Sequence, residues 1–378
     1  MKAVVYLTAG DEIAAWRQAG VGEVILAPRE LSRRGTLTLA QARELARQAS
    51  AAGLRPLLEW DALMEGPRLR ACLPLVSEAH ADFAALRVRD AGAALWARDN
   101  TSLPLQLLLE AGHHNLPALE SWRARLGSRL ERFCLSPELT LHTLGLWRSQ
   151  MPVPFEVLGL GPLLLFHSPR ALLSPLSGAA ASTREEQWAE GASEESPHKG
   201  FLLSENAHGT LMFHPKDLGV LDRWTALAGS GVDVVRIDHR REEPHAVAAI
   251  AEFLGAPADA TALRARWGRD WMRGYLDVNK SDVLFERLKN DHLAYSEHNC
   301  GEVLEGKRES WLAVRVTGEI RLGETLELVN PKGERRPLKL AWLKDDAFQP
   351  VTILADGQVG FVPWEAAAPT KTRLRRCP

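Results

Sequence analysis

Cysteine is scarce in this 378-residue chain, and its four cysteines lie far apart. They stand at positions 72, 134, 300 and 377, so the sequence holds no C-x-x-C pair and no compact Cys/His quartet. Thiolate ligands of zinc or of an iron–sulfur cluster come in closely spaced groups in most proteins. The spacing therefore predicts no metal site, and the lack of a disulfide framework is typical of a reduced, cytoplasmic protein.

An excess of one charge and long apolar runs are also lacking. The formal net charge is −2, from 46 basic and 48 acidic residues, which favours neither nucleic acid nor an anionic membrane as a partner of the whole chain. The longest uncharged apolar run, 157–166, is about half of what a bilayer span needs. The N-terminus, MKAVVYLTAGDE, reaches acidic residues at once and predicts a first strand, not a signal peptide. Two short basic clusters, Arg33 with Arg34 and 371–376, read as solvated surface.

Short apolar runs alternate with helical patterns through the first two-thirds of the chain. Strands are predicted at 3–7, 23–27, 55–58, 83–88, 104–109, 132–135, 155–160, 210–213 and 232–237. Strands separated by helices of this length indicate βαβ units and a parallel sheet. About eight or nine strands before residue 240 favour a (β/α) barrel of the TIM type, complete or incomplete, over an open doubly wound sheet.

Two segments depart from this rhythm. Residues 174–200 are rich in Ser, Ala, Gly and Glu, and we expect them to form a mobile insertion without strands. After about residue 300, short β-branched runs alternate with turn residues, which predicts a small C-terminal all-β barrel. The predicted domains are therefore a barrel over 1–295 and a β-module over 305–378, with the boundary in the polar segment 294–309.

Several segments resemble peptidase family U32, the collagenase-like peptidases. FHPKDLGVLD at 213–222 and RIDHRR at 236–241 are similar to the family's SPKDL and KIEGR motifs. EVLGLGPLLLFHSPRALLS at 156–174 resembles the family signature, and LPLQL at 103–107 and FCLSPEL at 133–139 match two further segments. The resemblance covers most of the chain. It implies a (β/α) barrel with a terminal β-module and, by the family's customary label, a hydrolase acting on peptide bonds.

The chain departs from the family pattern at the cysteines. Family members that act in RNA or ubiquinone hydroxylation hold an iron–sulfur cluster on four cysteines, two of them inside the signature. Leu164 and Ala171 stand at those two positions here, and the following segment, 174–200, contains no cysteine. Leucine and alanine cannot ligate iron, so we expect the family's 4Fe–4S cluster to be absent and predict no cofactor.

The resemblance leaves three functions open. The first is a hydrolase with a peptide substrate, catalytically degenerate because the cluster cysteines are missing. The second is a protein of RNA base modification or hydroxylation, with tRNA or rRNA as substrate. The third is a paralogue that binds a substrate or partner without catalysis.

Polar residues at the carboxyl ends of parallel barrel strands form the predicted site. The candidate catalytic residues are Glu59, Glu110, His113, Glu138, Lys216 and Asp217. The candidate substrate-binding residues are Arg89, Asn115, Arg236, Asp238 and Arg240.

Each candidate role has a structural alternative. Glu59 is a general base or the cap of the next helix, and Asp217 stabilises the start of a helix predicted after Pro215. His113 is a candidate because imidazole titrates near neutrality. Arg236 and Arg240, with the carboxylate between them, share one face of a strand and its exit. They bind a phosphate or carboxylate, or they belong to an ion network that closes the barrel.

Overall fold

The computed structural model describes residues 1–177, 186–192, 199–242, 245–257, 259–277, 298–331, 333–366 and 368–376. The chain divides into two compact units, Met1–Asn279 and Lys280–Pro378, each with its own hydrophobic core. The second unit begins before the predicted residue 305. Its first strand, β15 (Asn299–Lys307), occupies most of the predicted boundary segment because Cys300 and Val303 are buried in the core of that unit.

The first unit is a closed barrel of eight parallel strands. They are β1 (Lys2–Tyr6), β2 (Glu23–Leu26), β3 (Arg55–Trp60), β4 (Ala85–Val88), β5 (Leu105–Leu109), β6 (Leu130–Leu135), β7 (Phe155–Gly161) and β13 (Val234–Ile237). Each pairs with its neighbour in this order, and β13 closes the ring by pairing with both β1 and β7. This confirms the TIM-type barrel, in its complete form.

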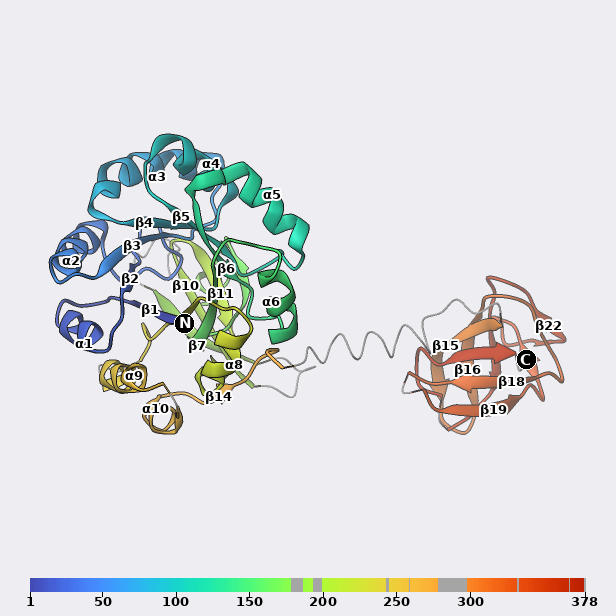
Figure 1. Cartoon of the computed structure of the whole chain (residues 1–378). Helices are drawn as coiled ribbons and strands as arrows, with labels where there is room; N and C mark the ends of the chain where they lie inside the picture. The colour runs from blue at the N-terminus through green and yellow to red at the C-terminus, as the bar shows by residue number, and fades with distance from the viewer. Residues whose placement is uncertain are drawn as a thin grey trace. The chain divides into compact units, whose positions relative to one another are not determined.

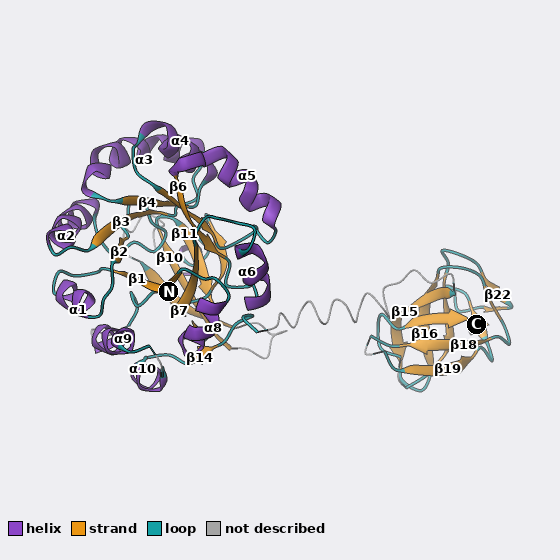
Figure 2. Cartoon of the chain, viewed as in Figure 1, coloured by secondary structure: helices purple, strands orange, loops and turns teal. Residues whose placement is uncertain are grey.

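Helices cover the outside of the barrel (Figures 1 and 2). They are α1 (Glu12–Gln18), α2 (Leu39–Ala51), α3 (Gly66–Ala79), α4 (Ala91–Asn100), α5 (Leu116–Leu126), α6 (Leu141–Arg148), α8 (Trp224–Gly229), α9 (His245–Gly255) and α10 (Thr261–Arg266). Within the described ranges, every helix is too short or too polar to cross a bilayer.

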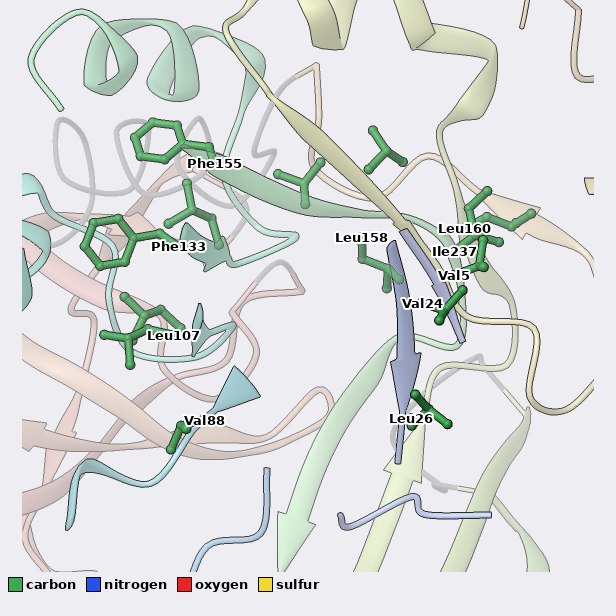
Figure 3. Packing of buried hydrophobic residues seen from close by; sticks show 14 of the residues in the cluster. Val5, Val24, Leu26, Val88, Leu107, Phe133, Phe155, Leu158, Leu160 and Ile237 are labelled. Atoms are coloured by element: carbon green, nitrogen blue, oxygen red, sulfur yellow. The ribbon is translucent and has the colours of Figure 1, made fainter. Parts of the chain in front are cut away.

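Apolar side chains on the outer face of the strands form the main core. Val5, Val24 and Leu26 belong to this cluster with Phe133 and Phe155 (Figure 3). Because successive residues of a strand point to opposite faces, the residues between these positions point into the barrel. Helices α2, α4, α5 and α6, which cover the strands, each begin at a side-chain N-cap. Thr38 and Gln41, for example, form a reciprocal capping box at the start of α2.

The connection from β7 to β13 carries a small antiparallel sheet. Its strand order is β8 (Leu164–Ser168), β11 (Gly209–Phe213), β10 (Lys199–Asn206) and β9 (Gln187–Ala192). The predicted strand at 210–213 is therefore present, but it pairs with β8 and β10 and not with the barrel. The expectation that 174–200 contains no strand is wrong for Gln187–Ala192, because cross-strand pairing with β10 overrides its weak strand composition. Residues 178–185 and 193–198 lie outside the described residues.

The helix predicted directly after Pro215 is absent. Asp217–Gly219 instead form a short strand, β12, which pairs with β7 and with β14 (Trp271–Met272). The buried carboxylate of Asp217 accepts hydrogen bonds from Trp267 Nε1 and Arg269 Nε, both at 3.0 Å, which fixes the extended backbone. The helix of this segment, α8, starts later, at Trp224.

The second unit is built of antiparallel strands, as the turn-rich sequence predicts. Besides β15 they are β16 (Trp311–Val316), β17 (Ile320–Arg321), β18 (Thr325–Val329), β19 (Arg335–Lys339), β20 (Leu343–Lys344), β21 (Pro350–Val351), β22 (Ile353–Leu354), β23 (Val359–Pro363) and β24 (Arg373–Arg376). The main sheet runs β19-β18-β24-β15-β16-β23-β20-β21, and β17 pairs with β22.

Glu205 of β10 holds the chain segment that follows β8. Its buried carboxylate accepts hydrogen bonds from the backbone N–H groups of Leu173 and Ser174, from the hydroxyl of Ser174 and from Thr210 Oγ1. Burial alone would raise the pKa of Glu205, but these hydrogen bonds, above all that from Ser174, lower it to about 2.

We expect Glu205→Gln to lower the free energy of unfolding by about 1.5–3 kcal/mol at neutral pH, since hydrogen bonds to a charged acceptor are lost. A depressed pKa stabilises the fold above the unfolded pKa, and that stabilisation is lost as pH falls through about 2. Urea unfolding at several pH values should therefore show the two proteins converging towards acid pH. Glu190→Gln, on the exposed face of the same small sheet, is the control. Equal stability of Glu205→Gln and wild type at pH 7 would contradict the assignment.

Candidate active site at the mouth of the barrel

Charged and polar side chains occupy positions inside this barrel where most TIM barrels place branched apolar residues. Arg87, Gln106 and Glu156 are fully buried and come from β4, β5 and β7. Arg132 of β6 is also buried. All four stand at inward positions in the two-residue alternation of their strands.

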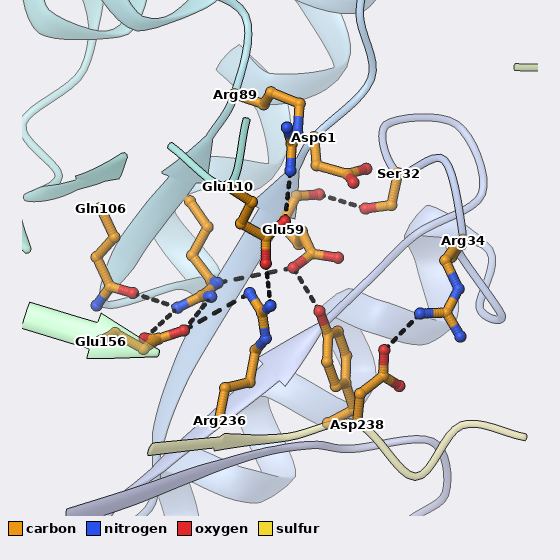
Figure 4. A network of polar contacts seen from close by, with 12 residues as sticks. Ser32, Arg34, Glu59, Asp61, Arg89, Gln106, Glu110, Glu156, Arg236 and Asp238 are labelled. Carbon is orange, nitrogen blue, oxygen red and sulfur yellow. Dashed lines mark hydrogen bonds and ion pairs between the residues drawn. The ribbon is translucent and has the colours of Figure 1, made fainter. Parts of the chain in front are cut away.

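The carboxylate of Glu156 is the centre of this interior network. It accepts hydrogen bonds from Arg87 at 2.7 and 2.9 Å and from Arg132 at 3.1 Å. Arg236 Nη1 lies 3.7 Å from this carboxylate (Figure 4). Burial would raise the pKa of Glu156, but the guanidinium groups of Arg87 and Arg132 hold it well below its usual range. One carboxylate thus bonds to two guanidiniums inside the barrel and lies near a third.

A cavity of about 100 Å³ lies above this network, at the carboxyl ends of the strands. Its charged lining consists of five arginines and four carboxylates: Arg33, Arg34, Arg89, Arg236 and Arg240, with Glu59, Asp61, Glu110 and Asp238. Tyr6, Leu158 and Leu164 are among its other lining residues. The positive charges therefore exceed the negative ones by one when every group is ionised.

Glu110 lies between two of these arginines, and its carboxylate bonds to both Arg89 and Arg236. Burial opposes ionisation, but Arg236 and Arg89 lower the pKa of Glu110 to about 2. The Nε–H groups of Arg89 and Arg236 are buried without an acceptor in the described part of the chain. Burial, together with the charge of Arg33, lowers the pKa of Arg89. These two N–H donors therefore lack hydrogen-bond acceptors, and a bound anion would supply them.

Asp238 and Asp61 fix the remaining arginines of the cavity wall. Asp238 bonds to Arg240 at 2.7 and 2.9 Å and to Arg34 at 2.6 Å. Asp61 bonds to the backbone N–H and the guanidinium of Arg33, at 2.7 and 3.0 Å. The prediction that Arg33 and Arg34 are solvated surface is wrong, since Arg33 is only 5% exposed and both residues reach the cavity.

Glu59 differs from the other carboxyl groups of the cavity. Tyr6 donates a hydrogen bond of 2.8 Å to its Oε2 atom, while the nearest guanidinium atoms, of Arg87 and Arg240, lie 3.7 Å away. Burial and then the charge of Asp61 raise the pKa of Glu59. A carboxyl group that holds its proton more firmly than its neighbours is suited to acid–base chemistry.

The sequence-predicted residues divide into two groups. Those that line the cavity are Glu59, Arg89, Glu110, Arg236, Asp238 and Arg240. Those that do not are His113, Asn115, Glu138, Lys216 and Asp217.

Four of the five residues in the second group bond to partners outside the cavity. His113 accepts a hydrogen bond from Trp122 Nε1 at 3.2 Å, and the side chain of Asn115 caps α5. Glu138 is exposed. Lys216 pairs with Asp270 at 3.3 Å on the surface, and Asp217 is the buried partner of Arg269. The side chains of these five residues therefore do not line the cavity.

Sequence reasoning missed the second half of the site. Tyr6 and Asp61 in the cavity, and Arg87 and Glu156 below it, were not candidates. The sequence signal for Asp61 and Arg87 is the two-residue alternation of a strand. Asp61 follows Glu59 by two positions and Arg87 precedes Arg89 by two, so each shares a strand face with a candidate residue.

The residues at the family's cluster positions do not fit an iron–sulfur cluster. Leu164 lies in the cavity wall with an apolar side chain, and Ala171 has no donor atom. Cys72, Cys134 and Cys300 come from α3, β6 and the second unit. Burial raises the pKa of Cys134 and brings that of Cys300 to about 11, which opposes thiolate formation. In the described ranges, no group of three or more His, Cys, Asp or Glu side chains is placed to hold a metal ion.

The closed parallel barrel and its polar carboxyl-end cavity define a TIM-barrel protein with its site in the usual place for that class. The chain belongs to peptidase family U32, whose sequence model matches residues 11–280. It is 23% identical to tRNA hydroxylation protein P of Escherichia coli (strain K12) over 314 residues, 66% of this chain and 67% of that protein.

Solved structures show weaker likeness. The U32 peptidase Mk0906 matches with 12% identity and a TM-score of 0.41, covering 65% of this chain and 94% of that one. Tryptophan synthase from M. tuberculosis matches with 14% identity and a TM-score of 0.37, covering 70% of this chain and 89% of that one.

We expect Glu156→Gln to lower the free energy of unfolding by about 3–5 kcal/mol, because breaking a buried ion pair leaves uncompensated buried charges. Denaturant unfolding followed by circular dichroism measures the change. Glu44→Gln, in an exposed pair with Arg47 on α2, is the control and should change the free energy of unfolding far less, because solvent screens an exposed ion pair. A Glu156 variant as stable as the control would show that the interior network does not support the barrel.

Proposed function

We propose that this chain acts in RNA modification and that the mouth of its barrel binds a small anionic substrate for that reaction. The observation that carries the proposal is the cavity with five arginines, two of which have buried Nε–H groups without an acceptor in the described residues. Guanidinium groups bind carboxylates and phosphates through paired, charge-assisted hydrogen bonds. The RNA part of the proposal is supported by the similarity to a tRNA hydroxylation protein.

Peptide hydrolysis is the alternative that the family label suggests, and the cavity favours it less. At about 100 Å³ the cavity accepts one small charged group more readily than a stretch of polypeptide. Among the residues that the structure describes, its lining contains no serine, threonine, cysteine, histidine or lysine. A covalent mechanism of the usual hydrolase type needs such a nucleophile beside a base.

The cavity residues take distinct roles in the proposed reaction. Arg89 and Arg236 hold the anionic group, with Glu110 keeping both guanidiniums in place. Glu59 exchanges a proton with the bound substrate, because its pKa is raised above that of an ordinary glutamate. Tyr6 orients the Glu59 carboxyl group through its hydrogen bond.

Analysis of tRNA nucleosides by mass spectrometry in a strain that lacks the gene tests this function. We expect a hydroxylated nucleoside to disappear and to return with the wild-type gene but not with Glu59→Gln. Arg89→Lys keeps the charge and loses the planar fork, so it should restore only part of the signal. Glu44→Gln and Arg98→Lys, at exposed sites on α2 and α4, are the matched controls and should restore all of it.

An unchanged nucleoside profile in the deletion strain would contradict the RNA function. Release of peptides from gelatin by the purified protein, abolished by Glu59→Gln, would establish the hydrolase instead. Binding of small carboxylates without either activity would identify a non-catalytic paralogue.

We also infer that the protein carries no family-type iron–sulfur cluster, because leucine and alanine replace thiolates at Leu164 and Ala171. Protein purified without oxygen should be colourless and hold no stoichiometric iron. It should stay colourless after incubation with iron and sulfide, while a relative with all four family cysteines turns brown under the same treatment. A brown product with stoichiometric iron would overturn the inference and require the distant cysteines to converge.

A further inference from the structure

An open groove of about 340 Å³ adjoins the mouth of the barrel. It is lined by Arg34, Thr36, Glu186, Trp188, Arg240 and Arg241. Arg34 and Arg240 also line the barrel cavity, so the two hollows share a wall. A chain lying in the groove would pass directly beside the candidate active site.

Aromatic and guanidinium groups contact one another along this groove. Trp188, on the edge strand β9, is 42% exposed and stacks against Phe213 with ring centroids 6.4 Å apart. The guanidinium of Arg241 lies 4.2 Å from the centroid of the Trp188 ring. On the Phe213 side, the guanidinium of Arg34 lies 4.9 Å from the ring centroid. Stacks of aromatic rings and guanidinium planes are the surfaces on which proteins hold unpaired bases.

Arg241 differs from the other cations of the groove. Arg34 and Arg240 both bond to Asp238, whereas Arg241 Nη1 is buried without an acceptor in the described residues. Burial, and then the charges of Arg269 and Arg34, lower the pKa of Arg241 to about 10. Arg241 Nη1 thus lacks an acceptor within the described residues, so an arriving anion gains a hydrogen bond that these residues do not supply.

We propose that a single-stranded segment of RNA binds in this groove, with one base stacked on the Trp188–Arg241 pair and the adjoining phosphate bound by Arg241. The next nucleotide then lies at the entrance of the barrel cavity, beside the small anionic substrate. This deepens the proposed function and rests on it. RNA suits the groove better than a peptide does, because the described part of the groove combines an exposed aromatic platform with three guanidiniums and the carboxylate of Glu186.

Binding of fluorescently labelled tRNA to the purified full-length protein, measured by anisotropy at several salt concentrations, tests the proposal. Trp188→Ala should bind about 10-fold more weakly, as expected for the loss of one base stack. Trp188→Phe keeps an aromatic platform and should bind nearly as well as wild type. Arg241→Ala should weaken binding and lower the salt slope by about 0.7, the value for one phosphate contact on a single strand. Glu186→Gln should strengthen binding, since it removes a negative charge from the lining of the groove.

Arg98→Ala is the matched control, because it removes one exposed arginine from α4. Thermal melting of each variant excludes unfolding as a cause of weak binding. Wild-type affinity in folded Trp188→Ala and Arg241→Ala would overturn the groove assignment, and so would an equal loss in Arg98→Ala. If the tRNA nucleosides still depend on the gene in that case, the proposed function stands without this groove. If wild type neither binds tRNA nor changes its nucleosides, both fail.

Discussion

The buried pairing of Glu156 with Arg87 and Arg132 is the interaction on which the barrel interior depends. Charges removed from water are costly unless their partners are close and hydrogen-bonded. Here one carboxylate, contributed by β7, binds guanidiniums from β4 and β6 at hydrogen-bond distance. Hydrogen-bonded ion pairs that join three strands favour one arrangement of those strands. Packing of aliphatic side chains is less directional and favours a single arrangement less strongly.

The same network determines what the mouth of the barrel can do. Arg236 lies 3.7 Å from Glu156 on one side and bonds to Glu110 on the other, so it connects the interior to the cavity. Its guanidinium is therefore held in place before any ligand arrives. Preorganised charge of this kind stabilises a bound anion without the entropic cost of ordering a flexible side chain.

Much of the barrel could be predicted from the sequence, because its strands are short apolar runs separated by amphipathic helices. The antiparallel insert could not. Gln187–Ala192 has no strand composition and becomes β9 only because β10 offers it an edge. At the site, strand-end residues such as Glu59, Arg89 and Glu110 were predictable from topology alone. The pairing of Arg87 with Glu156 was not, because a single charge within an apolar strand does not reveal which distant strand supplies its partner.

Arg33 and Arg34 show the same limit on a loop. As a pair of adjacent arginines they are typical of solvated surface. Asp61 and Asp238, distant in sequence, bond to them and bring both to the cavity. The local sequence pattern predicts solvated arginines, but long-range ion pairs place both of them in the cavity wall.

The balance of charge in the cavity couples ligand binding to proton uptake. Glu110 is already shared by Arg89 and Arg236, so an incoming anion competes with a carboxylate that is held in place. Burial already raises the pKa of Glu59. The negative charge of an anion bound beside it would disfavour ionisation of Glu59 further. Substrate binding would then raise the pKa of Glu59 further and favour the protonated carboxyl group, with Tyr6 as its hydrogen-bond partner. The cavity that attracts the anion thereby also prepares the acid that the proposed reaction needs.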